Sequence, residues 1–237
     1  MRLKNQSISS SIFLLIIGTF FISGCQDNEP SESSRSAPTS FTFLELGANT
    51  IYSKSVRSKL GNELGSVAIS YQTPIDLEIN YPGFIEKYFK PIHQLDQLLN
   101  DAAGARREHP TIRLMYRYPQ KKSRLFKKVE LLFSSQSKKP LFFKIVARKE
   151  GTDIIEAMHE KYGPSKETKW SHQPGVSHSW EKNGDFLIVS RILDRLGDPE
   201  YRIAIYYGTN INELIGSEQR QIKQSENIRK KAGRTAF

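Results

Sequence analysis

Two histidines and one aspartate in the second half of the chain have the side-chain types of an acid–base or metal site. His172 and His178 flank the turn sequence QPGVS, Asp185 follows, and Trp170 and Trp180 lie beside them. Imidazole and carboxylate groups can move protons at a substrate or ligate a metal ion. Their spacing matches no recognised metal-ligand pattern. Two alternatives therefore stay open: exposed histidines on a hairpin, or the site of a periplasmic enzyme, of hydrolytic type.

The only cysteine of the 237-residue chain, Cys25, follows a segment with the features of an export signal. This segment has a basic start, an apolar run over 12–22, and two small residues, Ser23 and Gly24. Such a succession is typical of a secretory signal. The apolar run is shorter than the roughly 20 residues that a membrane-spanning helix needs. We therefore expect residues 1–24 to be removed rather than to anchor the chain.

The sequence Ile22-Ser23-Gly24-Cys25 resembles the lipobox of bacterial lipoproteins. The resemblance implies that a diacylglyceryl group is attached to the Cys25 sulfur, with palmitate among its acyl chains, and that the signal is cut before this residue. Lipidation would also account for a thiol that has no disulfide partner in an exported protein. Gln26 stands where an aspartate would signal retention at the inner membrane. We therefore expect the periplasmic side of the outer membrane in the cell envelope.

The composition divides the rest of the chain into three parts. Residues 25–40 are rich in Ser, Pro and acidic residues and cannot bury enough apolar surface to fold. They are expected to form a disordered tether. Residues 41–215 have the length of one domain, and we expect a single globular α+β domain there. Residues 216–237 carry six Lys or Arg against two acids and are expected to form a basic tail or helix.

Apolar residues alternate with polar ones over five segments of the domain, which predicts β-strands. The connections between them are short and rich in turn residues, so we expect a mostly antiparallel sheet in the form of a β-meander, with packed helices. The expected apolar face consists of Ile112, Leu114, Tyr116 and Tyr118; Val129, Leu131 and Phe133; Leu141, Phe143, Ile145 and Ala147; Phe186, Ile188, Ser190 and Ile192; and Tyr201, Ile203, Ile205 and Tyr207.

Helical spacing of apolar residues predicts a helix over 84–99, which Pro91 should split. A second helix is expected to begin at Asp153 as N-cap and to stop at Gly163. A C-terminal helix is expected to open at Asn210. The sequences VRSKLG at 56–61 and MHEKYG at 158–163 echo one another, and each glycine is expected to close a helix. The first copy, with the residues before it from 44, resembles the helix pattern of small outer-membrane lipoproteins of the BamE type.

The opposite face of the expected strands is basic. The whole chain has a formal charge of +10, of which Arg2 and Lys4 in the signal contribute two. If every strand alternates as expected, these side chains form a cationic patch for an anionic envelope component or an acidic protein. A covering helix with basic side chains at its rim is the alternative. The residues concerned are Arg113, Arg117, Lys128, Lys144, Arg148, Arg191 and Arg202.

No nucleic-acid-binding motif and no catalytic or cofactor-binding motif occurs in the sequence. We therefore expect a membrane-anchored lipoprotein with a binding or structural role and no cofactor. The alternative is an enzyme of unrecognised type that uses the hairpin from His172 to Asp185.

Overall fold

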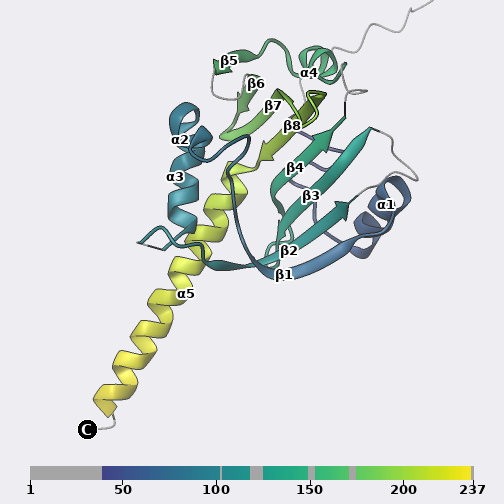
Figure 1. The fold of residues 1–237 in the computed structure, drawn as a ribbon. Helices are drawn as coiled ribbons and strands as arrows, with labels where there is room; N and C mark the ends of the chain where they lie inside the picture. Colours follow the sequence, from purple (N-terminus) through teal and green to yellow (C-terminus); the bar gives the residue numbers. More distant parts are fainter. Residues whose placement is uncertain (1–38, 102, 118–124, 149–152, 171–174, 236–237) are drawn as a thin grey trace, which may run out of the picture. The chain divides into compact units, whose positions relative to one another are not determined.

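The computed structural model describes residues 39–101, 103–117, 125–148, 153–170 and 175–235. Cys25, Tyr118 and His172, with the expected signal and most of the tether, lie outside these ranges. Within them the chain forms an antiparallel sheet and five helices, which confirms the α+β class (Figure 1). The strands are β1 (Ala68–Pro74), β2 (Glu108–Arg117), β3 (Phe126–Ser134), β4 (Pro140–Ala147), β5 (Lys166–Trp170), β6 (Gly175–Lys182), β7 (Asp185–Leu193) and β8 (Pro199–Tyr206). The helices are α1 (Lys54–Leu64), α2 (Phe84–Tyr88), α3 (Lys90–Leu99), α4 (Ile154–Tyr162) and α5 (Gly208–Thr235).

The eight strands form one sheet in the order β1-β2-β3-β4-β8-β7-β6-β5. This order departs from the single meander that the short connections suggested. After β4 the chain forms α4, restarts at the far edge with β5, and returns strand by strand until β8 pairs with β4. The sheet thus consists of two four-stranded meanders that meet at its centre.

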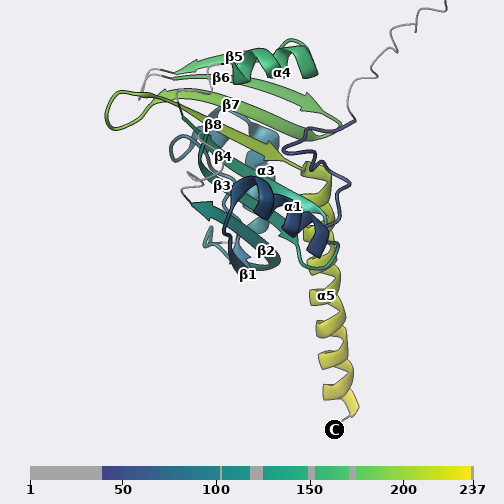
Figure 2. The same ribbon diagram turned by 90° about the vertical axis from the view of Figure 1, so that its right-hand side faces the viewer.

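Each face of the sheet carries its own apolar core. Side chains of one face, here called the strap face, pack beneath α2, α3 and the start of α5; they include Leu132, Phe142, Ile188, Ala204 and Tyr206. The opposite face packs against α1 and α4 and includes Leu131, Phe143, Leu187, Val189 and Ile205. Figure 2 shows α1 and α3 on opposite sides of the strands.

The expected alternation is wrong in β7. Leu187 and Val189 pair with Ile205 and Ile203 and join the core of the opposite face, whereas Ile188 lies on the strap face. The reason is that β7 is buried on both faces, so its apolar run shows no period of two. Leu141 also belongs to the strap-face core, next to a register shift between β3 and β4.

The helix expected over 84–99 is split as predicted. The chain breaks at Phe89, and Pro91 lies in the first turn of α3, where its missing N–H is not needed. The two echoed helices end differently. Gly163 ends α4, but α1 continues through Gly61 and ends at Gly65.

Asp153 is the N-cap residue of α4 as expected, although its side chain makes no cap hydrogen bond. The start expected for α5 at Asn210 is wrong. Helix α5 begins at Gly208, and the buried carboxylate of Asp185 in β7 lies near the backbone N–H groups of Gly208 and Thr209. Asn210 is buried inside the helix, where its amide nitrogen donates to two carbonyls of other segments. The cap of α5 therefore comes from a distant strand, which local sequence could not indicate.

Candidate functional site

Residues 75–82, here called the strap, cross the strap face between β1 and α2 (Figure 1). Three alternating apolar side chains, Ile75, Leu77 and Ile79, point into the core beneath it and are buried. The strap belongs to no strand of the sheet. Its backbone carbonyls therefore need donors other than a neighbouring strand, since buried peptide groups are almost always hydrogen-bonded.

Side chains of the sheet and of nearby segments supply those donors. Four strap carbonyls and the carbonyl before the strap accept hydrogen bonds of 2.8–3.3 Å from Arg, Lys or Tyr side chains. Hydrogen bonds that involve a charged group each contribute about 1.5–3 kcal/mol. The donor–acceptor pairs are Arg113 to Pro74, Arg106 to Ile75, Tyr206 to Leu77, Lys144 to Glu78 and Arg202 to Asn80.

Three of the expected cations, Arg113, Lys144 and Arg202, thus share the strap face and hold the strap. Two of them also pair with acids of the sheet: Arg113 Nε lies 3.0 Å from Glu130 Oε1, and Arg202 Nε donates to Glu200 Oε1 at 3.1 Å. Burial lowers the pKa of the Lys144 ammonium, although two nearby carboxylates oppose this shift. These three cations therefore stabilise the strap, and their N–H groups are already engaged within the protein.

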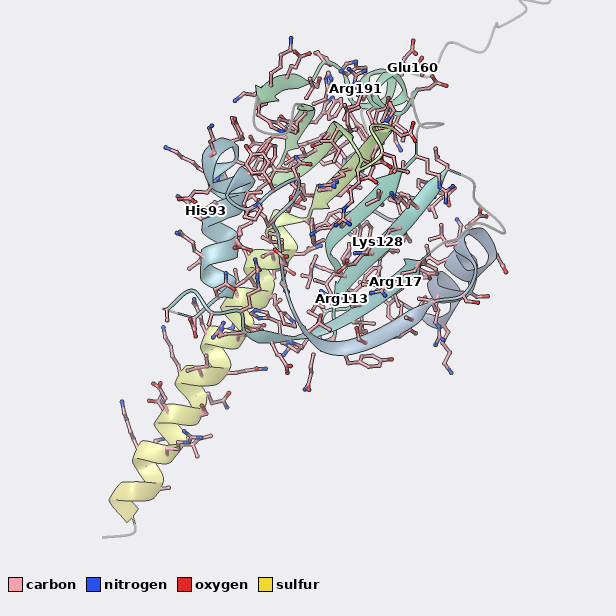
Figure 3. The ribbon with its side chains drawn as sticks, viewed as in Figure 1. His93, Arg113, Arg117, Lys128, Glu160 and Arg191 are labelled. Atoms are coloured by element: carbon pink, nitrogen blue, oxygen red, sulfur yellow. The ribbon has the colours of Figure 1, made fainter. Side chains whose placement is uncertain are left out.

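Arg117, Lys128 and Arg148 have different surroundings. Arg117 is exposed at the end of β2 and donates to the sulfur of Met115, a weak acceptor. Lys128 pairs with Glu130 at 3.1 Å. Arg148 follows the last residue of β4. Figure 3 shows Arg113, Arg117 and Lys128 close together over β2 and β3.

The prediction that Arg191 shares this face is wrong. Arg191 pairs with Val176 and with Tyr201, whose ring packs in the core of the opposite face. Figure 3 places Arg191 near α4, away from Arg113 and Arg117. The cause is the reversed alternation in β7, because a shift of one residue moves every side chain of a strand to the other face.

A cavity of about 630 Å³ lies between the strap and the sheet. It is here called the strap cleft. Basic and acidic side chains line it together with apolar groups, and the basic ones outnumber the acids. The lining residues are Asp76, Glu78, Ile79, Asn80, Tyr81, Pro82, Arg117, Lys127, Lys128, Lys144, Val146, Glu200, Arg202 and Ile203.

A second cavity, of about 770 Å³, adjoins the strap cleft. The two share Lys127, Glu200 and Arg202, and the second continues along the loop between β7 and β8. Leu193, the last residue of β7, is 59% exposed, and Leu196 in the loop is 87% exposed. A groove with basic walls therefore ends beside an exposed apolar loop.

The acids of the strap cleft are largely engaged. Glu78 accepts hydrogen bonds from the N–H groups of Gly83 and Ile85 at the start of α2. Glu200 binds both Lys127, at 2.9 Å, and Arg202. Among the described residues, Arg117 is the cation of the cleft without a carboxylate or carbonyl partner, and Lys128 has Glu130 as its partner. An anionic ligand would therefore find the N–H donors of Arg117 least occupied.

Sequence reasoning missed the strap and Lys127. Lys127 reaches the strap cleft because β3 has an irregular register between Phe126 and Lys128. A strap is visible in the sequence only as alternating apolar residues followed by the turn signal Asn80-Tyr81-Pro82-Gly83. That turn also holds Asn80, whose side-chain oxygen is buried without a hydrogen-bond partner among the described residues. This oxygen could accept a hydrogen bond from a ligand.

The hairpin histidine His178 belongs to a separate cluster. Its Nδ1 lies 3.0 Å from the hydroxyl oxygen of Ser165, which lies 2.8 Å from Nε2 of His159 on α4. Burial lowers the pKa of His178, and the nearby charge of Arg191 acts in the same direction. A serine hydroxyl within hydrogen-bond distance of an imidazole is one part of a nucleophile–base arrangement, which also needs a group that orients the base.

The structure does not bring His178 and Asp185 together. Val189, the cross-strand partner of His178, lies four residues from Asp185, roughly 13 Å at about 3.3 Å per strand residue. Asp185 is instead the cap of α5. Burial raises its pKa to about 6, and the nearby backbone N–H groups of Thr209 and Gly208 oppose that shift.

Neither a metal cluster nor a membrane-spanning helix occurs in the parts of the chain that the structure describes. There, His, Cys, Asp and Glu side chains form no group of three or more that could hold a metal ion. None of the helices there combines the length and apolar composition needed to cross a membrane. In comparisons with known proteins, no family model, no curated protein and no solved structure matches this chain.

Proposed function

We propose that this chain is a lipid-anchored protein of the bacterial cell envelope that binds an anionic ligand in the strap cleft and has no catalytic role. The observation that carries the proposal is the composition of the cleft: five basic side chains and three acidic ones line one cavity of about 630 Å³. Cavities of this size accommodate small molecules or the head of a larger one. Carboxylates and phosphates are the groups that Arg and Lys bind best.

Within the cleft, Arg117 and Lys128 are the proposed ligand-binding residues. Arg113, Lys144 and Arg202 keep the strap in place, so they shape the site rather than contact the ligand first. Arg148 and Arg191 are not part of the proposed site. Lipid head groups, lipopolysaccharide phosphates, peptidoglycan carboxylates and acidic proteins are the anions that such a protein would meet in the envelope.

Photocrosslinking in the envelope tests this site. We would replace Pro82, which lines the cleft, by p-benzoylphenylalanine, and compare it with the same replacement at Tyr71, 63% exposed on the edge strand β1. A ligand in the cleft should give an adduct with the Pro82 variant that weakens when Arg117 and Lys128 are both changed to Gln. Equal adduct yields from Pro82 and Tyr71 would contradict the proposal. So would an adduct at Pro82 whose yield does not change when Arg117 and Lys128 are replaced by Gln.

The proposed anchor has an independent test. The lipobox resemblance requires a thioether at Cys25, so the mature N-terminus should carry a diacylglyceryl mass on this residue. Cys25→Ser should abolish that mass and leave the signal uncleaved by the lipoprotein-specific peptidase. An unmodified Cys25 in mass spectra of the wild-type protein would rule out the anchor and leave the cleft proposal standing.

The hydrolytic enzyme remains the second candidate because Ser165 lies within hydrogen-bond distance of both His159 and His178. If Ser165 is a nucleophile, a fluorophosphonate probe should label it, and Ser165→Ala or His178→Gln should abolish labelling. The absence of labelling in the wild-type protein would remove this candidate.

A further inference from the structure

Helix α5 extends well beyond the part of it that packs on the domain. Its first turns contribute Ile211, Leu214 and Ile215 to the core of the strap face. Farther along, Glu218 lies 2.9 Å from Nδ1 of the buried His109. Every residue from Gln219 to Ala232 is exposed. Residues 219–235, here called the arm, are about 25 Å long at about 1.5 Å per residue, and both ribbon views show this part of α5 running away from the sheet (Figures 1 and 2).

Four of the five described basic side chains of the arm lie along one side of it, and Arg229 lies on the other side. At about 100° per residue, Arg220, Lys223, Lys230 and Lys231 fall within an arc of about 100°. A shallow groove along the helix confirms this placement for three of them, because it is lined by Arg220, Lys223 and Lys231 together with Ile228. Arg220, Lys223, Lys230 and Lys231 are here called the basic stripe. By the same spacing, the centre of the stripe lies about 150° around the helix from Ile211 and about 110° from Ile215, both of which pack in the core of the strap face.

The arm lacks the features of a helix that binds a protein groove. Such helices present apolar anchors at positions i, i+3, i+4 and i+7. The arm has only two large apolar side chains, Ile222 and Ile228, and their spacing puts them about 120° apart around the helix. Recognition by the arm therefore depends on charge. A straight row of cations along a helix can contact a flat surface of anionic groups.

We infer that the basic stripe binds the surface of an anionic phospholipid membrane. Each Lys or Arg close to such a surface raises the affinity about fivefold. Four of them give a reversible contact that falls steeply as salt rises, because charges are screened over about 8–10 Å near physiological salt. With little apolar surface, the arm lies at the level of the head groups rather than among the acyl chains. The inference does not depend on the ligand of the strap cleft.

Limited proteolysis of the full chain tests this contact. The chain would be reconstituted into vesicles of phosphatidylcholine, alone or mixed with phosphatidylglycerol, so that any lipid anchor contributes equally to both. Trypsin cleavage after Arg220 would be followed by mass spectrometry and referred to cleavage after Lys54, which is exposed on α1. We expect cleavage after Arg220 to slow about tenfold in the anionic vesicles and to recover in about 0.5 M salt. Equal rates in the two kinds of vesicle would overturn the inference.

A matched pair of variants assigns the effect to the stripe. Changing Lys223, Lys230 and Lys231 together to Gln should abolish the protection of Arg220. The control changes three exposed lysines elsewhere, Lys54, Lys90 and Lys166, to Gln, with cleavage after Arg57 as the reference, and should keep the protection. Equal loss in both variants would mean that net charge, and not the stripe, attracts the membrane.

Two other binding partners of the arm would give different patterns of protection from trypsin. Protection by poly-glutamate, without protection by anionic vesicles, would replace the membrane by an acidic protein. Protection that rises with protein concentration in the absence of vesicles would indicate a second copy of this chain. Either outcome would overturn the inference.

Discussion

The strap cleft and the arm are both rich in Lys and Arg but use them differently. In the cleft, Arg202 and Lys144 donate hydrogen bonds to backbone carbonyls of the strap, and Arg202 also binds a carboxylate. On the arm, Arg220, Lys223 and Lys230 are exposed along a helix that leaves the domain. A count of basic residues therefore cannot identify a binding surface. The buried carbonyls and acids around each cation decide whether it stabilises the fold or remains available to a partner.

The largest expected effect comes from breaking the strap. Arg202→Leu removes the donor to the Asn80 carbonyl and one of the two cations that bind Glu200. Leaving these groups unpaired should lower the free energy of unfolding by about 2–4 kcal/mol, measured by urea denaturation. The matched change Arg220→Leu on the arm should cost less than about 0.5 kcal/mol. Similar losses in the two variants would erase the distinction between the regions.

We expect a measurable energetic coupling between His109 and Glu218, the pair of residues at the boundary between the packed part of α5 and the arm. Nε2 of His109 lies 2.8 Å from the Leu99 carbonyl and Nδ1 lies 2.9 Å from Glu218. A carbonyl only accepts hydrogen bonds, so Nε2 donates to Leu99, and the other ring nitrogen faces the Glu218 carboxylate. His109→Ala should cost about 2–3 kcal/mol, and a double-mutant cycle with Glu218→Ala should give a coupling above about 1 kcal/mol.

Glu226, which is exposed on the arm, is the control for this cycle. Glu226→Ala should change the free energy of unfolding by less than about 0.5 kcal/mol and show no coupling to His109. If Glu218 and Glu226 behaved alike, the arm would begin earlier in α5 than its contacts indicate.

Asp185, which caps α5, should make the stability depend on pH. Its pKa is raised to about 6 in the folded protein, from an ordinary value of 3.8. The folded state thus holds the proton more tightly than the unfolded state, so this group adds stability as the pH falls from about 7 toward 4. Because an asparagine amide cannot titrate, wild-type stability relative to Asp185→Asn should rise by about 1–2 kcal/mol between pH 7.5 and pH 4.5. Parallel pH profiles from urea denaturation would show that the cap does not carry the shift.

The smallest effect on stability is expected on the arm. Changing Lys223, Lys230 and Lys231 together to Gln should alter the free energy of unfolding by less than about 0.5 kcal/mol, because all three side chains are exposed. A larger change would show that the arm contributes to the fold, and the contrast with the strap cleft would weaken. Thermal and urea unfolding of the variant measure this directly.

Part of this structure could be predicted from the sequence because local pattern and environment agree. Strands β2 and β3 have the alternation expected, with Leu114 and Leu131 in one core. The split between α2 and α3 follows from the rigid ring of Pro91. The α+β class and the antiparallel pairing were therefore accessible without coordinates.

Other features depend on contacts between distant segments. Strand β7 is covered on both faces, so its sequence does not show which side Arg191 occupies. The strap cleft combines side chains of the strap with those of β2, β3, β4 and β8, whose neighbours are set only by the strand order. The cap of α5 is Asp185, far from the helix in sequence. Of the expected cations, Arg113, Lys144 and Arg202 hold the strap, and Arg117 and Lys128 line the strap cleft, but the strap itself was not foreseen.

The central position of β8 has a consequence for how the chain acquires its structure. Phe142 of β4 pairs with Tyr206 of β8, so the seam of the sheet joins segments that are far apart in sequence. The edge of β4 in the first meander stays unpaired until β8, the last strand in sequence, is available to pair with it. Long-range pairing of this kind slows folding and exposes an unpaired edge to aggregation in the meantime. A chain stopped before residue 199 would lack β8, so β5, β6 and β7 would have no strand to connect them to β4.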